Sequence, residues 1–198
     1  MEISPVTLNG RVVRLEPLTP AHGEAFATLG VEGDIFRYFP IALKTRDELL
    51  RYVEFSVGAQ AAGLGVSWAT VALASGDVIG GTSFLNIDPQ NRRLEIGGTW
   101  IAPAWQGSAC NAEAKYLQLR HAFEELGCIR VEFKTDSRNE RSRAALRRIG
   151  ATEEGTLRNH MIMPDGHLRH SVYFSIIDSE WPQVKANLET RIERLLSR

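Results

Sequence analysis

The sequence predicts an α+β fold, in which a mostly antiparallel sheet holds one parallel pair of strands. Three observations support this prediction. Several short segments alternate apolar and polar residues, as half-buried strands do. Turns rich in glycine, proline and aspartate at residues 75–77 and 164–166 join neighbouring segments as hairpins. Between residues 94 and 135 a strand, a long helix and another strand follow one another, and such a crossover joins parallel strands.

The chain is expected to begin with a strand and a helix. Residues 11–17 (RVVRLEP) alternate apolar and polar side chains, as a half-buried strand should. A helix then begins at Thr19 or Pro20. Gly30 and Gly33 end it, because glycine is a poor helix former.

A second helix is predicted at residues 45–62. Thr45 and Glu48 match the Thr-x-x-Glu capping box that begins many helices. The buried stripe of this helix consists of Leu49, Tyr52, Val53 and Val57. Residues 35–40, which precede the helix, form an aromatic loop whose rings belong either to the core or to the mouth of a substrate site.

Three strands and a long helix are expected next. The strands are predicted at residues 67–74, 78–86 and 93–101. The turn Asp88-Pro89-Gln90-Asn91 leads into the third of them. The helix spans residues 111–126 and ends at Gly127, a C-terminal cap. Its apolar positions recur every three or four residues and are Ala112, Tyr116, Leu119, Phe123 and Leu126.

The remaining elements complete a single predicted domain over residues 1–198. They are a strand at 129–135, a short helix at 137–149, strands at 152–163 and 167–177, and a final helix at 179–196. Ser137 and Glu140 match a capping box for the short helix. The apolar side of the final helix consists of Trp181, Val184, Leu188, Ile192 and Leu195.

Composition excludes several classes of partner. The chain has 198 residues, 43% of them hydrophobic, which is enough for a substantial core. Its net charge of −1 gives no attraction for nucleic acid or an anionic membrane, and no apolar run reaches the length of a membrane span. The N-terminus lacks the basic and apolar regions of a signal peptide. Cys110 and Cys128 make no disulfide framework, so a cytoplasmic location is expected, and no metal site is predicted.

A turn of small residues precedes the long helix at residues 106–111 (QGSACN). A strand that leads through such a turn into a helix leaves backbone N–H groups without intrahelical partners. Together with the positive end of the helix dipole, these groups suit a pyrophosphate. Most junctions of this kind bind nothing, so the turn alone leaves both readings open. It is neither a P-loop nor a G-x-G-x-x-G fingerprint.

The same turn resembles the acyl-CoA loop of the GNAT N-acetyltransferases, written Gln/Arg-x-x-Gly-x-Gly/Ala. Here Ala109 replaces the central glycine and Asn111 the last small residue, so the motif is degenerate. The flanking segments 100–103 (WIAP) and 112–114 (AEA) resemble the RimJ/RimL-like branch, which acetylates N-termini of ribosomal proteins. The order of elements from residue 11 to 177 also matches the GNAT order.

The resemblance implies a GNAT fold with helices on both faces of the sheet and a parallel pair that splays apart to admit a ligand. It implies acetyl-CoA as the cofactor, with CoA as product. The residues expected to bind it are Trp100, Ile101, Gln106, Gly107, Ser108, Ala109, Cys110, Asn111, Asn139 and Ser142. An arginine-rich stretch at residues 138–148 is either a solvated helix face or a further phosphate contact.

Glu95 is the predicted general base, because it is a carboxylate within an otherwise apolar strand. In similar enzymes a glutamate of this strand works through an ordered water, but it lies one residue further downstream. A bulge near residues 97–98 would absorb the difference. Without one, Glu95 would face solvent. His160 and Asp136 are the alternative bases.

Asn139 and Ser142 match the second family signature, Asn-x-x-Ser. The resemblance implies that the asparagine binds the pantetheine arm and that Ser142 protonates the leaving thiolate. The tyrosine often found in this helix corresponds here to Leu146. Local helix hydrogen bonding is the alternative role for Ser142. Cys110 lies at a helix N-terminus, which lowers a thiol pKa, so it could be mistaken for a nucleophile. The family transfers the acetyl group directly, however, and Cys110 is expected to be a small packed residue.

The predicted function is transfer of an acetyl group from acetyl-CoA to the primary amine of a small molecule or a peptide, such as a protein or peptide N-terminus, by direct attack in a ternary complex. The alternative is an acyl-CoA-binding sensor or scaffold without catalysis, which the degenerate loop favours. No nucleic acid or membrane partner is expected, and a homodimer remains open.

Overall fold

The computed structural model describes residues 1, 3–30 and 34–197. The strands are β1 (Leu8–Asn9), β2 (Val13–Pro17), β3 (Val66–Ala72), β4 (Val78–Asp88), β5 (Arg93–Ile101), β6 (Arg130–Asp136), β7 (Thr152–Ile162) and β8 (Leu168–Ile177). The α-helices are α1 (Gly23–Gly30), α2 (Arg46–Ala61), α3 (Cys110–Arg120), α4 (Glu140–Ile149) and α5 (Trp181–Leu196). Two 3-10 turns, η1 (Pro20–His22) and η2 (Pro103–Trp105), and a π-helical turn, η3 (His121–Glu125), complete the elements.

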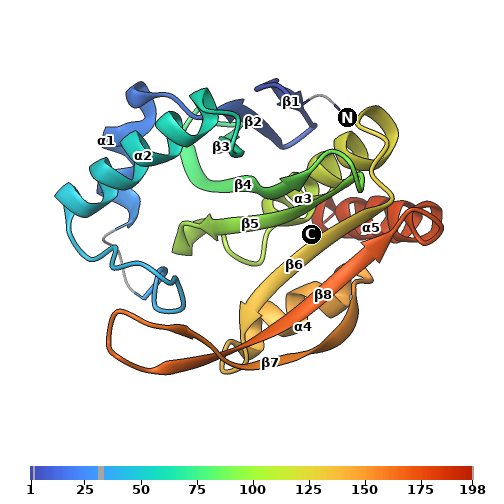
Figure 1. The fold of residues 1–198 in the computed structure, drawn as a ribbon. Helices are drawn as coiled ribbons and strands as arrows, with labels where there is room; N and C mark the ends of the chain where they lie inside the picture. Colours follow the sequence, from blue (N-terminus) through green and yellow to red (C-terminus); the bar gives the residue numbers. More distant parts are fainter. Residues whose placement is uncertain (2, 31–33, 198) are drawn as a thin grey trace.

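The strands form one mixed sheet in the order β1-β2-β3-β4-β5-β6-β8-β7 (Figure 1). Every neighbouring pair is antiparallel except β5 and β6, which are parallel. The predicted α+β fold with one parallel pair is therefore confirmed. Among the described residues, no helix is long and apolar enough to cross a membrane.

Helices cover both faces of the sheet, and each face has its own core. On one face α1 and α2 pack against Trp100 and the loop that holds Phe36. On the other face α3, α4 and α5 pack against the apolar side of the central strands, including Phe84, Val131 and Phe174. In Figure 1 the helices α3 and α5 lie side by side behind the sheet, away from α1 and α2.

The parallel strands β5 and β6 are paired only over three residues. Residues Arg93–Glu95 face Arg130–Glu132, and beyond them the two strands diverge (Figure 1). β5 instead stays paired with β4 up to Ile101, while β6 stays paired with β8 up to Asp136. The sheet therefore opens into a V at its centre, which is the splay that the family resemblance implied.

A β-bulge interrupts β5 just beyond this point. Gly81 of β4 faces Trp100 and Ser83 faces Gly97, so one residue of β4 stands opposite two of β5. Gly98 adopts φ +59 within the bulge, a left-handed conformation that favours glycine. The extra residue reverses which face later side chains point to. Ile96 accordingly packs on the α3 side, whereas Trp100 packs on the α1 side.

Several predicted boundaries hold closely. The strand at 93–101 matches β5, and the helix at 45–62 matches α2 with Thr45 as N-cap and Ala62 as C-cap. The capping box is confirmed, since the Glu48 N–H donates to Thr45 Oγ1 at 3.3 Å and the Thr45 N–H donates to Glu48 Oε2 at 3.0 Å. α1 ends at Gly30, and Gly33 lies outside the described residues.

Other predictions need correction. The strand β1 was not predicted, because two residues are too few to show an alternating pattern. The helix at 111–126 forms as α3 followed by the π turn η3, with Gly127 at φ +66 after it. The predicted single stripe of α3 was also too narrow. Because α3 lies between the sheet and α5, residues on most of its sides are buried, including Ala114, Leu117 and Gln118.

The predicted capping box at Ser137 was wrong. α4 begins at Glu140, and its N-cap is Asn139, whose Oδ1 accepts a hydrogen bond from the Ser142 N–H at 3.0 Å. The buried carboxylate of Asp136 accepts the Arg138 N–H at 2.9 Å. This bond and that of the Asn139 N–H to the Asp136 carbonyl hold residues 136–139 in a turn, so the helix starts later.

Candidate active site

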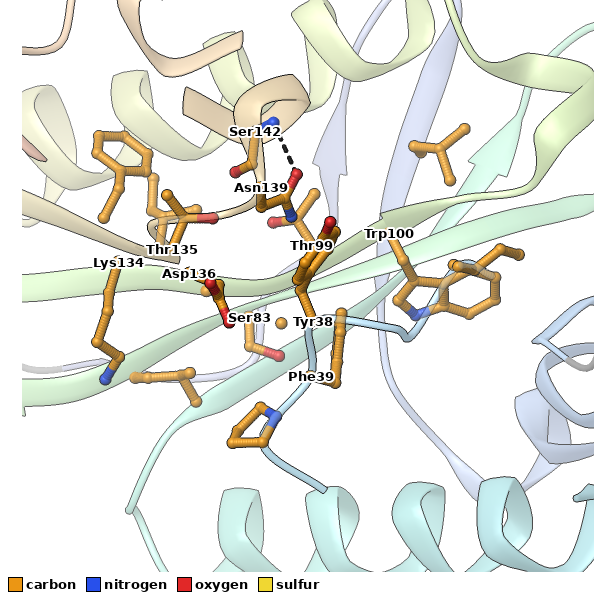
Figure 2. A pocket seen from close by; sticks show the side chains of 18 of the residues that line it. Tyr38, Phe39, Ser83, Thr99, Trp100, Lys134, Thr135, Asp136, Asn139 and Ser142 are labelled. Atoms are coloured by element: carbon orange, nitrogen blue, oxygen red, sulfur yellow. Dashed lines mark hydrogen bonds between the residues drawn. The ribbon is translucent and has the colours of Figure 1, made fainter. Parts of the chain in front are cut away.

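A cavity of about 870 Å³ lies where β5 and β6 diverge, a volume typical of ligand sites. Figure 2 shows its walls: Ser83 comes from β4, Thr99 and Trp100 from β5, and Lys134, Thr135 and Asp136 from β6. Asn139 and Ser142 close one end from the start of α4, and the loop holding Tyr38 and Phe39 reaches across the space. Side chains far apart in the sequence therefore meet around one opening.

Glu95 is buried, with 3% of its surface exposed, and it lines this cavity. Its Oε2 accepts a hydrogen bond from Asn86 Nδ2 at 2.8 Å and lies 3.3 Å from Lys134 Nζ. The alternative of a solvated outward carboxylate therefore does not apply. The bulge that the family resemblance required is present further along β5, at Gly98. The placement suits a general base, and that role remains a prediction.

The two alternative bases lie in different surroundings. Asp136 lines the cavity, and Arg138 holds its carboxylate through Nε at 3.1 Å and Nη2 at 2.8 Å. Burial alone would raise the pKa of Asp136, but the hydrogen bonds from Arg138 lower it below its ordinary value. His160 is not among the residues that line the cavity, and its Nδ1 lies 3.0 Å from Ser171 Oγ. Glu95 is thus the best placed of the three.

Asn139 and Ser142 both line the cavity, as the Asn-x-x-Ser signature predicted. The cap bond joins Asn139 Oδ1 to the Ser142 N–H, which leaves the amide Nδ2 of Asn139 and the hydroxyl of Ser142 available to a ligand (Figure 2). Leu146 also lines the cavity and is buried, and it offers no hydroxyl group. Ser142 is therefore the hydroxyl that α4 supplies here.

The predicted loop at 106–111 divides into two sets of residues. Gln106, Gly107 and Asn111 line the cavity, as do the preceding Trp100 and Ile101. Ser108, Ala109 and Cys110 do not line it. Ala109 and Cys110 are buried, and Ser108 Oγ donates to the Trp105 carbonyl at 2.7 Å. The side chains of this second set shape the turn, and their contact with a ligand stays a prediction.

Three residues of the loop have distinct surroundings on the cavity wall. Gln106 Nε2 donates to the Ile101 carbonyl at 2.8 Å, which ties the loop to the end of β5. Gly107 adopts φ +83, and no atom lies within 4 Å of where its side chain would start. Asn111 Oδ1 is buried without a hydrogen-bond partner among the described residues. An orphaned polar atom of this kind on a cavity wall indicates a group to be bound.

The arginine-rich stretch also divides. Arg143 and Arg147 pair with Glu153, and Arg138 pairs with Asp136. Arg141 lines the cavity and has no hydrogen bond or ion pair within the described part of the chain. Most arginines of this stretch therefore form ion pairs within the protein or face solvent. Arg141 is the arginine that could contact a phosphate.

Lys115 was missed by the sequence analysis. It lies on α3, is 6% exposed and lines the cavity. Its Nζ donates to Thr99 Oγ1 at 2.7 Å, to Gln118 Oε1 at 3.0 Å and to Thr82 Oγ1 at 3.1 Å. Burial without a carboxylate partner lowers the pKa of Lys115 to about 7. A lysine on an amphipathic helix usually lies on the solvated side, so no sequence pattern indicated that Lys115 is buried.

Comparisons with known proteins show which family and fold the chain shares. The family model for the acetyltransferase (GNAT) domain matches residues 13–152. A curated relative, "Putative ribosomal N-acetyltransferase YdaF" of Bacillus subtilis (strain 168), is 38% identical over 109 residues. That match covers 55% of this chain and 58% of the relative, so it spans less than two thirds of the relative's length.

Solved structures show the same fold. A GCN5-related N-acetyltransferase from Brucella melitensis superposes with a TM-score of 0.88 at 30% identity, covering 95% of this chain and 86% of the other. RimJ of Mycobacterium smegmatis, solved with CoA-disulfide, superposes with a TM-score of 0.81 at 21% identity, covering 94% and 95%. The second likeness is one of fold alone. The family model covers well over half of the chain, and the chain belongs to the GNAT acetyltransferase family.

Proposed function

We propose that this protein transfers an acetyl group from acetyl-CoA to a primary amine by direct attack within a ternary complex. The observation that carries the proposal is the position of Glu95, a buried carboxylate that faces the opening between β5 and β6. Family membership supports the reaction class, and the loop at residues 106–111 and the aromatic loop at residues 35–40 both contribute residues to the cavity wall. The cavity would then hold both substrates.

The residues around the cavity fit CoA. Gly107 and the first turn of α3 would hold the pyrophosphate, with Arg141 as a further cation. Asn111 Oδ1 and Asn139 Nδ2 would bind the amide groups of the pantetheine arm. Acetyl-CoA supplies the acetyl group as a thioester, whose leaving thiolate needs only modest acid help.

The chain's own groups then have distinct tasks. Glu95 accepts a proton from the acceptor's ammonium, directly or through a water, because only the free amine can attack. Asn86 and Lys134 hold the carboxylate in place through Oε2. The Ser142 hydroxyl gives a proton to the departing sulfur. Burial of the cavity wall keeps the carboxylate out of bulk water.

The acceptor is proposed to be a peptide or protein N-terminus, and the protein is proposed to act in the cytoplasm. The curated relative is named as a ribosomal N-acetyltransferase, which supports a protein acceptor. Two free, buried cysteines, Cys110 and Cys128, suit a reducing compartment.

Two measurements separate an enzyme from a sensor. Acetyl-CoA and CoA should each raise the melting temperature, because a ligand that binds only the folded state adds about 2.7 kcal/mol at a hundredfold excess over its Kd. NAD and ATP should have a much smaller effect. An enzyme will also release free thiol from acetyl-CoA when amines are supplied, whereas a sensor will bind without release. If neither compound shifts the melting temperature, both functions are wrong.

A further inference from the structure

Arg169 of β8 is a buried cation on the wall of the same cavity. Only 4% of the surface of Arg169 is exposed. Nε donates to Ser171 Oγ at 3.0 Å, and Nη1 donates to the backbone carbonyl of Tyr38 at 3.3 Å. A guanidinium has five N–H groups. Within the described part of the chain these two bonds are the only ones it makes, so most of its donors remain for a ligand.

No carboxylate among the described residues forms an ion pair with Arg169. The two nearest acidic groups already have cations of their own: Arg138 holds Asp136, and Lys134 lies beside Glu95. Burial lowers the pKa of Arg169, and the charges of Asp136 and Glu95 only partly oppose that effect. A buried charge without a partner lowers the stability of the fold, so stability does not explain why Arg169 is buried here.

Near Glu95 and Asp136, Arg169 is therefore the cation that no described carboxylate pairs with. Glu95 and Lys134 offset each other, as do Asp136 and Arg138, and Arg169 remains. All three groups line the cavity from the neighbouring strands β5, β6 and β8, and Ser171, which accepts a hydrogen bond from Arg169, stands opposite Asp136. A molecule with an ammonium for the carboxylates and an anion for Arg169 would match this arrangement.

We propose that Arg169 forms a subsite for a carboxylate of the amine acceptor. This inference rests on the proposed function and names its substrate class: primary amines that carry a carboxylate close to the amine. The planar guanidinium binds carboxylates through two parallel hydrogen bonds, which gives both affinity and direction. The carboxylate has two possible sources, the α-carboxylate of a free amino acid or the side chain of a peptide's N-terminal acidic residue.

The test compares pairs of acceptors that differ in this charge, and each variant is compared with the parent on the same acceptor, so that differences in amine basicity cancel. One arm sets free amino acids against their amides, and the other sets peptide amides that begin with aspartate against those that begin with asparagine. Each pair is measured with the parent protein, Arg169→Gln and Arg169→Lys. Arg158→Gln is the control, since Arg158 is exposed on the adjacent strand β7 and does not line the cavity.

The parent should favour the carboxylate member in one arm, and that arm identifies the source. Arg169→Gln should lower kcat/KM for this member at least about 30-fold while leaving the amide within about threefold. Arg169→Lys keeps the positive charge but lacks the planar set of donors, so it should retain part of the preference for the carboxylate member. Arg158→Gln should behave as the parent. Acetyl-CoA affinity should be the same in all four proteins.

Two outcomes would overturn the subsite. One is a parent that uses both members of every pair equally. The other is an Arg169→Gln variant that loses both members in proportion, because Arg169 would then only anchor the Tyr38 loop. If no amine is acetylated, the proposed function is wrong, but the subsite can still be tested. Calorimetric titration with the same acceptors in the presence of CoA then measures whether they bind. Carboxylate binding that Arg169→Gln abolishes supports it, and absence of such binding in the parent overturns it.

Discussion

Lys134 Nζ lies 3.3 Å from Glu95 Oε2, and the two residues stand on the strands that diverge just beyond Glu95. Asn86 Nδ2 donates to the same oxygen at 2.8 Å, so the carboxylate is held by both neighbouring strands of β5. Oε1 has no hydrogen bond among the described residues, and it is the atom free to accept a proton from an amine. The position of Glu95 therefore follows from the strand geometry rather than from a flexible loop.

Replacing Glu95 by glutamine should lower kcat by about 100-fold or more near neutral pH, because the ammonium then has no internal base. Activity should recover partly as the pH rises toward the pKa of the acceptor amine. Steady-state rates from pH 6 to 9 check this, with acetyl-CoA affinity unchanged. Glu54→Gln, an exposed change on α2, is the matched control. A parental pH profile in Glu95→Gln would remove Glu95 from the chemistry.

Ser142→Ala should lower kcat less than Glu95→Gln does, since it removes only help to a good leaving group. The helix should persist, because the cap bond uses the backbone N–H of Ser142 and not its hydroxyl. The deficit should shrink with a thioester whose thiol is more acidic. Equal deficits for both thioesters would show that the hydroxyl acts in binding or structure instead.

Asn139→Asp separates capping from ligand binding. Aspartate keeps the oxygen that accepts the Ser142 N–H and is also a good N-cap, so stability should change little. It lacks the Nδ2 donor and should weaken CoA binding about tenfold. Asn139→Ala loses both features and should be less stable as well, by about 1 kcal/mol. Calorimetry with CoA and urea unfolding measure the two effects. Unchanged CoA affinity in Asn139→Asp would show that the amide does not contact the ligand.

At Gly107, two substitutions isolate charge from backbone strain. The residue has φ +83, so any side chain is strained there, and asparagine and aspartate are similar in size. Gly107→Asp should weaken CoA binding much more than Gly107→Asn, because it places a negative charge where phosphates are proposed to lie. Titration with CoA at low and high salt measures the difference, which salt should reduce. Equal affinities for the two variants would place the phosphates elsewhere.

The sequence predicted the fold and part of the site because those features depend on local patterns. Strand alternation, the capping box at Thr45 and the turn at 164–166 are set by neighbouring residues. Asn139 and Ser142 were chosen through a family motif at fixed spacing, and Glu95 as a carboxylate within an otherwise apolar strand. The N-cap of α4 was misplaced, because it depends on how Asp136 is held by Arg138.

Residues whose role depends on tertiary contacts could not be predicted. In the sequence, Arg169 looks like an ordinary polar residue of a strand. It lines the cavity only because the loop at Tyr38 packs against it and the sheet opens beside β6. Lys115 reads as a solvated position of α3. It is buried because the bulge at Gly98 turns Thr99 toward that helix, where the hydroxyl meets Nζ at 2.7 Å.

The burial of Lys115 makes stability depend on pH in a definite direction. Its pKa falls from 10.5 to about 7 on folding, so between these values the unfolded chain binds a proton that the folded chain lacks. The free energy of unfolding therefore rises with pH above about 7, by up to about 1.4 kcal/mol per unit, and this contribution is flat below pH 7. Burial also raises the pKa of Cys128 to about 11, so ionisation of this thiol in the unfolded chain lowers the free energy of unfolding at higher pH. The effect of Lys115 is therefore best measured below about pH 8.5.

Urea unfolding of the parent and of Lys115→Met between pH 6 and 8.5 tests this directly. Methionine has nearly the length of lysine but no titrating group, and all other ionisable groups are common to both proteins and cancel in the difference. The parent should gain about 1–2 kcal/mol relative to the variant between pH 7 and 8.5, and nothing between pH 6 and 6.5. The variant's own loss, from Thr99 and Gln118 left without Nζ, should not vary with pH. Parallel curves across the whole range would mean that Lys115 keeps its proton, and the cavity would then hold one more cation at neutral pH.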